Sequence, residues 1–322
     1  MTTLQFHDVR DFQAMKFDSG QEVVRGFINT GERVLLVAAQ KSGKTIFCLQ
    51  LGLAVAAGVK FADYWEVPKA RRVIYVATEG SKAELQDEMR RIEVHQGAAE
   101  RGMFKLCYTP TLSINTDTEV YNQLRREIDA FQPDLLVLDC LYRVHAGSLN
   151  DDGLIKVTTE RINMLGENLA ILIPHHRHRP KHDQYGIEIN EGGNSYFGSA
   201  MLMGWATAQY GMSFSLLSHQ GSIEAFDERG VPKFGQPKDL ELIDPPEELY
   251  WVVTEKEMSP LAKTILNEMD RFEGMGIREI GRVLGGIHHT TIRGAVQELV
   301  GRKLVKTVSL GKGKSMTIGR VS

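Results

Sequence analysis

Short apolar runs alternate with polar, helix-forming stretches along most of the chain. Four of the runs are almost continuously apolar, as are strands that are buried on both faces of a sheet. The stretches between them, such as 84–96 and 153–166, carry apolar residues at helical spacing. This alternation predicts a mostly parallel, twisted α/β sheet with right-handed crossovers. The four runs are 33–37, 72–78, 133–139 and 170–174.

Two further patterns extend this sheet. A weaker strand is expected at 103–107, followed by a helix that ends near Phe131 and is capped by Ser113 or Thr116. From Ala206 onward, polar and apolar residues alternate one by one, which is typical of antiparallel strands. We therefore expect an antiparallel extension of the parallel sheet.

The end of the chain has a different pattern. Ser259 followed by Pro260 is a typical helix start, and two more short helices are expected at 276–284 and 292–301. Two short strands then flank a glycine- and lysine-rich tip. Three helices and a basic hairpin resemble a winged helix, whose third helix enters a major groove. Thr291 and Arg293 would face outward on that helix, and Lys312 and Lys314 would meet phosphate on the wing.

The polar segment at 255–260 predicts the boundary before this unit, which gives three regions. Residues 1–29 form an N-terminal arm, residues 30–256 the large α/β domain, and residues 257–322 the winged-helix domain. The alternative for the last region is a module that docks protein or drives oligomerisation, since winged helices also serve these purposes.

Charge is divided unevenly between these parts. Residues 259–322 contain 11 basic and 5 acidic side chains, whereas the preceding residues contain 27 basic against 36 acidic ones. A basic unit on an acidic body favours contact with an anion, most plausibly nucleic acid.

The start of the chain lacks the basic and apolar segments of a signal peptide, and no apolar run is long enough to span a bilayer. The three cysteines, Cys48, Cys107 and Cys140, lie in apolar elements without a pairing pattern. We expect buried thiols in a cytoplasmic protein that does not contact membrane.

The most informative motif lies between the first apolar run and a long apolar helix. There a Gly-Lys-Thr sequence turns from strand to helix, so several backbone N–H groups converge as they do at phosphate sites. Lys44 would reach the β- and γ-phosphates, and the Thr45 hydroxyl would ligate Mg²⁺. The alternative is a chance Gly-Lys-Thr in a helix-capping loop. The nucleotide-binding residues predicted here are Ala38, Ala39, Gln40, Lys41, Ser42, Gly43, Lys44, Thr45 and Ile46.

Two acids end neighbouring apolar runs. Asp139 follows four apolar residues and can support Mg²⁺ at the carboxyl end of its strand, although an aspartate there also starts turns. Glu79 ends the second run, where a carboxylate can orient and deprotonate the water that attacks the γ-phosphate. The alternative for Glu79 is an acid stabilised by the dipole of the following helix.

Together these motifs resemble the RecA-like ATPases and, within them, the RepA-like and DnaB-like hexameric helicases. The resemblance covers residues 31–209 and rests on 38–45, on Trp65-Glu66-Val67-Pro68, on Glu79, on 135–139 and on 175–179. It implies a RecA-like P-loop fold, ATP and Mg²⁺ as ligands, and Glu79 as catalytic base. It also implies that His175 or His176 senses the γ-phosphate, and we assign this role to His175.

The same resemblance implies that the loops at 142–152 and 177–194 line a central channel and contact single-stranded DNA. Arg177, Arg179 and Lys181 in the second loop suit a phosphate backbone, although surface loops are often basic. Four histidines lie in and just before this loop, at His175, His176, His178 and His182. The sequence shows no nearby cysteine or paired carboxylate that would complete a metal site with them.

One departure from that group is visible. Its members often carry an arginine that reaches the ATP of a neighbouring subunit, but the basic positions of the corresponding stretch hold Phe197 and Thr207 here. Arg177 or Arg179 could substitute, or turnover could be slow.

We therefore expect a homo-oligomeric DNA helicase or translocase of a plasmid, phage or mobile element, and the resemblance implies a hexamer. Two alternatives remain open. One is an initiator, helicase loader or recombination mediator that ATP switches without unwinding DNA. The other is a regulatory ATPase whose last domain docks protein.

Overall fold

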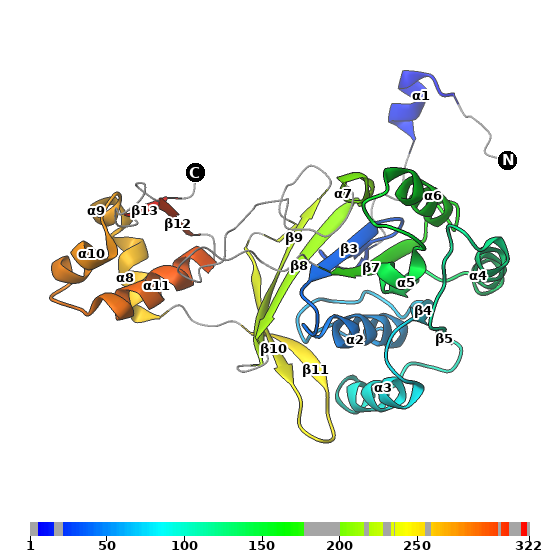
Figure 1. The fold of residues 1–322 in the computed structure, drawn as a ribbon, viewed down its shortest axis with the longest axis horizontal. Coiled ribbons are helices and arrows are strands. Elements are labelled where there is room, and N and C mark those ends of the chain that lie inside the picture. Colours follow the sequence, from blue (N-terminus) through cyan, green and yellow to red (C-terminus); the bar gives the residue numbers. More distant parts are fainter. Residues whose placement is uncertain are drawn as a thin grey trace.

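The computed structural model describes residues 6–15, 22–176, 200–215, 219–227, 233–234, 236–254, 259–301, 304–308 and 317–320. Within these residues, helices and strands form a large α/β part followed by a smaller unit (Figure 1). The helices are α1 (Val9–Ala14), α2 (Lys44–Ala57), α3 (Lys82–Gln96), α4 (Thr118–Phe131), α5 (Leu141–Val144), α6 (Asp152–Asn163), α7 (Ala200–Trp205), α8 (Pro260–Asn267), α9 (Met269–Phe272), α10 (Ile277–Val283) and α11 (His289–Gly301). The strands are β1 (Glu22–Val24), β2 (Ile28–Asn29), β3 (Arg33–Ala38), β4 (Val73–Ala77), β5 (Phe104–Tyr108), β6 (Leu135–Asp139), β7 (Ala170–His176), β8 (Ala208–Ser215), β9 (Gln220–Asp227), β10 (Lys238–Ile243), β11 (Tyr250–Thr254), β12 (Val305–Val308) and β13 (Thr317–Arg320).

The large sheet has nine strands in the order β11-β10-β9-β8-β3-β7-β6-β4-β5. The six strands from β8 to β5 are parallel, and β9 to β11 are antiparallel to their neighbours. This confirms the predicted parallel sheet with an antiparallel extension. The predicted antiparallel pairing holds for only one edge of β8, which is antiparallel to β9 but parallel to β3, through Val34 and Ala208.

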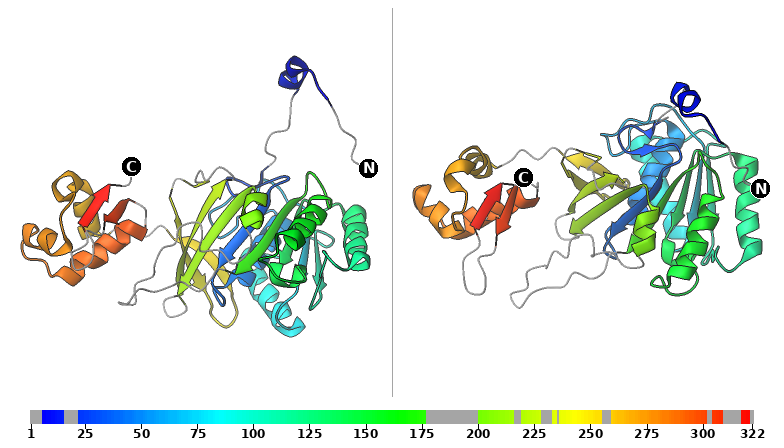
Figure 2. Two further views of the ribbon diagram at one scale, coloured as in Figure 1. Left: turned by 45° about the horizontal axis from the view of Figure 1, so that its top comes forward. Right: turned by 90° about the horizontal axis from the view of Figure 1, so that it is seen from above.

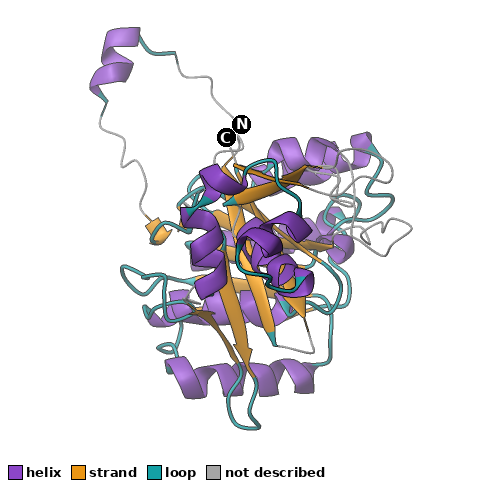
Figure 3. Ribbon diagram, turned by 90° about the vertical axis from the view of Figure 1, so that its left-hand side faces the viewer, coloured by secondary structure: helices purple, strands orange, loops and turns teal. Residues whose placement is uncertain are grey.

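Helices cover both faces of the sheet, which therefore lies between two apolar layers (Figures 2 and 3). One layer contains Phe47 of α2 and Ile92 of α3. The other contains Leu124 of α4 and Ile155 of α6. Burial on both faces explains why the parallel strands have continuous apolar sequences.

Two local predictions were wrong. The N-cap of α4 is Asp117, whose side chain accepts a hydrogen bond from the Val120 N–H, rather than Ser113 or Thr116. An ionised carboxylate at this position also interacts favourably with the helix dipole. Cys107 is exposed, because β5 is an edge strand, whereas Cys48 and Cys140 are buried as expected.

The residues of the predicted N-terminal arm behave in two ways. Helix α1 has no buried residue and extends from the body of the molecule (Figure 1). The β1–β2 hairpin instead buries Val24, Phe27 and Ile28 in the layer that contains α2. In the described part of the chain, no helix is both long and apolar enough to cross a membrane.

Helices α8 to α11 and the β12–β13 hairpin form a unit with an apolar cluster of its own, which includes Ile265, Phe272 and Leu299. Helix α8 begins as predicted, because the Ser259 hydroxyl accepts a hydrogen bond from the Ala262 N–H. The short helix α9 between the first two expected helices was not predicted.

Candidate active site

The loop between β3 and α2 is held in a sharp turn at the carboxyl edge of the sheet. Lys41 and Gly43 both have positive φ angles, of 58° and 74°. The Ser42 hydroxyl donates a hydrogen bond of 2.7 Å to the Ala39 carbonyl and closes the turn. Gly43 is the N-cap of α2 and provides no side-chain hydrogen bond. The first N–H groups of α2 therefore have no side-chain cap, as a phosphate site at a helix N-terminus requires.

The Lys44 side chain lies under this loop and is only 6% exposed. Its ammonium group donates hydrogen bonds to the carbonyls of Ala38, at 3.2 Å, and Ala39, at 2.6 Å. Burial lowers the pKa of Lys44, and the negative charge of Asp139 opposes this shift. A phosphate bound at the loop would replace the carbonyl contacts with stronger, charge-assisted ones.

Trp251 of β11 packs against the back of the loop. The indole is fully buried, and its Nε1–H points at the Gly43 carbonyl at 3.4 Å. A Cβ atom at Gly43 would lie 2.6 Å from the indole ring. The Gln50 side chain of α2 holds β11 in place, because its amide donates to the Trp251 carbonyl and accepts from the Trp251 N–H. The antiparallel extension of the sheet thus contacts the loop directly.

Asp139 ends β6 with its carboxylate buried beside α2. The Tyr75 hydroxyl donates to this carboxylate at 2.7 Å, and the Thr45 side chain also hydrogen bonds to it. Burial raises the pKa of Asp139, and the two hydrogen bonds oppose that shift. A hydroxyl and a carboxylate in contact at the edge of the loop provide the oxygen ligands that Mg²⁺ prefers.

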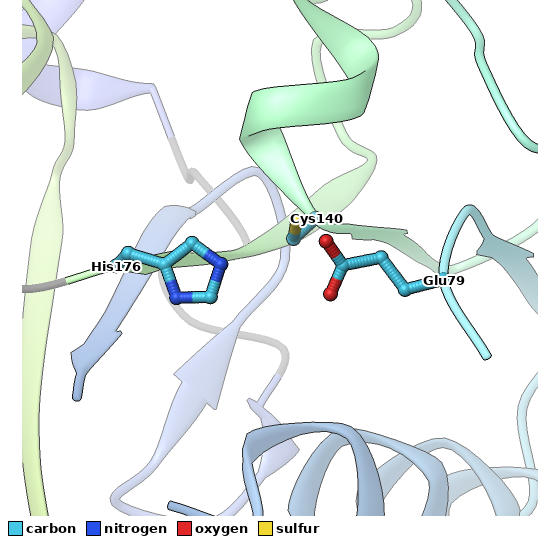
Figure 4. A group of neighbouring side chains, drawn as sticks. All are labelled: Glu79, Cys140 and His176. Carbon is cyan, nitrogen blue, oxygen red and sulfur yellow. The ribbon is translucent and has the colours of Figure 1, made fainter. Parts of the chain in front are cut away.

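Glu79 lies near the end of β4, where it meets two residues from adjacent strands (Figure 4). One is Cys140, which directly follows β6, and the other is His176, the last residue of β7. One potential ligand atom from each side chain lies within 4.8 Å of the other two. Burial, the nearby Glu79 and Asp139 charges and a hydrogen bond between the thiol and Glu79 raise the pKa of Cys140 to about 12. Glu79 itself is exposed, as a residue that activates a water must be.

The sequence assigned the γ-phosphate-sensing role to His175, but the structure places His176 rather than His175 beside Glu79. Successive residues of a strand face opposite sides of a sheet. His175 lies opposite Val37 in the register, on the face that holds Ile171 and Ile173 in the layer with α6. His176 lies opposite Ala38 on the other face, which is the face of Glu79 and Lys44. Burial, with the positive charge of Lys44, lowers the pKa of His176.

A comparison with protein-family models agrees with this geometry. A family model described as an AAA domain matches residues 2–180. The chain belongs to this family of P-loop ATPases.

None of the curated proteins matches the chain. Among solved structures, the KaiC-like protein PH0186 from the hyperthermophilic archaeon Pyrococcus horikoshii OT3 is similar. The two are 16% identical with a TM-score of 0.44, and the match covers 72% of this chain and 93% of that one.

The AAA domain has the predicted RecA-like arrangement, with the P-loop at the carboxyl edge of a mostly parallel sheet. Its donors fit ATP and Mg²⁺. The open N-terminus of α2 and the buried Lys44 suit phosphate, and Thr45 with Asp139 suits the metal. Ile46, the last residue of the predicted set, packs against the core behind the loop.

The predicted DNA-binding residues are only partly described. Arg177, Arg179, Lys181, Lys312 and Lys314 lie outside the described residues. Thr291 and Arg293 are exposed on α11, as predicted.

Thr207 immediately precedes β8. Its hydroxyl accepts a hydrogen bond from the Arg33 N–H, and its own N–H donates to the Arg33 carbonyl. Since Arg33 begins β3, this contact lies at the opposite end of that strand from the P-loop.

Sequence reasoning missed three residues that shape the site: Tyr75, Cys140 and Trp251. A tyrosine within a buried strand that precedes Glu79 is a signal for a polar partner, since a buried hydroxyl needs one. No local pattern marks Trp251 as a site residue, because its contact with Gly43 depends on how the large sheet curves around α2.

Proposed function

We propose that this AAA domain hydrolyses ATP with Mg²⁺ and that the cycle drives an action on DNA. The convergence of Lys44, the Thr45–Asp139 pair and Glu79 on one edge of the sheet carries the proposal. Lys44 would bind the β- and γ-phosphates, Thr45 and Asp139 would hold the metal, and Glu79 would activate water. His176, beside Glu79, is the residue that would respond to the γ-phosphate.

The outer face of α11 supports DNA as the partner. Arg293 and Gln297 are exposed there, and Arg278 of α10 lies nearby. The pKa of His289 is lowered by desolvation and by its neighbours His288, Arg278 and Arg293, so these groups lie close together. A basic surface at the start of the third main helix is what a winged helix presents to a major groove. We propose that residues 257–322 form a winged-helix domain, after an arm at 1–29 and an ATPase domain at 30–256.

The short helix α5 supports contact with single-stranded DNA. It follows β6 directly and exposes Tyr142 and Arg143, with the guanidinium carbon 5.7 Å from the ring centre. An exposed aromatic ring next to a cation is a typical platform for an unpaired base. We propose a homo-oligomeric helicase or translocase, such as a hexamer, of a plasmid, phage or mobile element. Loops 142–152 and 177–194 would contact the single DNA strand.

Thr207 favours a second candidate function. This side chain is neutral and is hydrogen bonded to the Arg33 backbone, so it supplies no charge to the ATP of a neighbour. A missing trans-acting arginine lowers the rate by about 10³–10⁵ in related phosphoryl transfer. Slow turnover suits an initiator, loader or mediator that ATP switches without unwinding DNA.

Replacing Glu79 tests the hydrolysis step. Glu79→Gln keeps the size of the side chain but cannot accept a proton, so ATP should still bind while phosphate release falls at least about 100-fold. Glu100→Gln is the matched control, because Glu100 is exposed in the loop before β5. Unchanged turnover in Glu79→Gln would refute the role of Glu79.

The two DNA functions separate in three measurements on the full chain. Phosphate release is compared with and without single-stranded DNA, forked-duplex displacement is followed with ATP, and subunit number is measured by sedimentation. A DNA-stimulated ring that displaces a strand supports the helicase. ATP-dependent assembly on DNA without displacement supports the switch.

A further inference from the structure

The cluster of Glu79, Cys140 and His176 has a chemistry that ATP hydrolysis does not require (Figure 4). P-loop hydrolysis uses oxygen ligands for Mg²⁺ and a carboxylate for water, but it has no use for a thiol. Here a sulfur, an imidazole nitrogen and a carboxylate oxygen lie within 4.8 Å of one another.

The fold brings these three groups together. Strands β4, β6 and β7 are adjacent and parallel, so their carboxyl ends meet at one edge of the sheet. Each end provides one of the three side chains, although they are far apart in the sequence. Sequence patterns alone do not predict this set, because its three members lie on three separate segments of the chain.

We propose that Glu79, Cys140 and His176 form a binding site for a zinc-class divalent cation. A bound cation prevents Glu79 from activating water and so inhibits ATP hydrolysis. This inhibition, unlike the binding itself, rests on the function proposed above. The donor set selects the metal. Thiolate and imidazole ligands favour Zn²⁺ or Co²⁺, whereas Mg²⁺ prefers oxygen. Three protein ligands and one open position are typical of zinc sites that keep a water.

The geometry of the cluster suits such an ion. Metal–ligand bonds of about 2.0–2.3 Å in a tetrahedron place ligand atoms roughly 3.5 Å apart. Side-chain rotations that move the three ligand atoms by about 1 Å would therefore bring them to these distances. Cys140 is buried and His176 half-buried, whereas Glu79 is exposed. The exposed side leaves an entry path and room for the water. The His176 ring turns Nε2 toward Cys140 and Glu79, whereas Nδ1 faces away and is buried without a hydrogen-bond partner among the described residues (Figure 4).

Cobalt binding to the full, nucleotide-free chain tests the site directly. A cobalt–thiolate bond gives a sulfur-to-metal charge-transfer absorption, which reports a cysteine ligand without any assay of activity. We expect this absorption at one equivalent of Co²⁺, and excess Mg²⁺ should leave it unchanged. Cys140→Ser should abolish it, and Cys107→Ser, which removes the exposed thiol of β5, should retain it. Equal absorption in Cys140→Ser would overturn the proposal.

A second variant covers the possibility that Cys140→Ser does not fold. His176→Gln should weaken zinc binding at least about tenfold, as measured by competition with a chromogenic indicator. Unchanged zinc affinity in a folded His176→Gln protein would equally overturn the site.

The effect on hydrolysis is measured with zinc well below the ATP concentration and with Mg²⁺ in excess, so that zinc–ATP complexes contribute little. One equivalent of zinc should reduce phosphate release at least about tenfold, and a chelator should restore it. A zinc-loaded protein that turns over at full rate would overturn the inhibition. If the protein binds cobalt but does not hydrolyse ATP even when zinc is absent, the proposed function is refuted and the metal site remains supported.

Discussion

At the carboxyl edge of the large sheet, several polar side chains are buried and hydrogen bonded within the protein, whereas on the outer face of α11 they project into solvent. Lys44 and Asp139 belong to the first set, and Arg293 and Gln297 to the second. A buried polar group is costly unless it is paired, so replacing one in the first set disturbs its neighbours as well as the chemistry. Replacing an exposed group on α11 should affect binding alone.

The largest expected effect is that of Lys44→Met, which keeps the length of the side chain but removes its charge. Phosphate release should fall about 10²–10³-fold, because a preorganised cation no longer faces the phosphates. Phosphate release and nucleotide affinity are measured together. Lys69→Met is the control, since Lys69 is exposed in the loop before β4 and lies outside the nucleotide-binding set. Equal losses in both variants would contradict a specific role for Lys44.

Gly43→Ala probes the packing behind the loop rather than its charge. A Cβ atom there would lie 2.6 Å from the buried Trp251 ring, and φ is +74°. We expect a loss of about 2–4 kcal/mol in the free energy of unfolding, from backbone strain plus overpacking. Gly26→Ala is the matched control, because its φ of +65° is similar but nothing lies within 4 Å. Chemical denaturation of both variants measures the difference, and equal losses would remove the role of Trp251.

The ionisation of Glu88 in α3 allows the comparison between buried and exposed polar groups to be tested by changing the pH. Burial, with the negative charges of Glu84 and Asp139, raises the pKa of Glu88 from 4.5 to about 7. The folded state thus holds the proton more tightly, and ionisation of Glu88 lowers the free energy of unfolding as the pH rises from 4.5 to about 7.

Glu88→Gln should therefore stabilise the protein by about 1 kcal/mol above pH 7 and leave it unchanged near pH 4. Thermal unfolding at the two pH values measures this, with Glu100→Gln as the exposed control. A destabilised Glu88→Gln protein at the higher pH would show that the charged form has a stabilising partner.

The smallest effect is expected for Arg293→Ala on α11. Thermal stability and ATP hydrolysis without DNA should stay the same, because the side chain is exposed. If α11 meets duplex DNA, affinity should fall a few-fold and the salt dependence of binding should lose about one unit of slope. Binding measured across salt concentrations distinguishes this from a helix face that docks protein, for which the DNA slope would not change.

The sequence predicted much of the nucleotide site because each key residue lies at the end of an apolar strand. Gly43, Lys44 and Thr45 follow β3, and Asp139 ends β6. The choice between His175 and His176 could also have been made, since strand alternation from Ile171 and Ile173 places His175 on the wrong face.

Other features depend on contacts across the sheet that local patterns do not encode. The strand order places β7 between β3 and β6, and this order brings His176 to Cys140 and Glu79. The exposure of Cys107 likewise follows from β5 being an edge strand, which an apolar sequence does not reveal.

The contact between Trp251 and Gly43 provides the protein with a built-in fluorophore. The chain has three tryptophans, and Trp65 and Trp205 lie in other surroundings, with Phe27 and Asn163 respectively. Trp251 alone of the three touches the P-loop glycine, so its emission should change when a nucleotide rearranges that loop. Ligand binding can therefore be followed optically in the unmodified protein, without a labelled nucleotide.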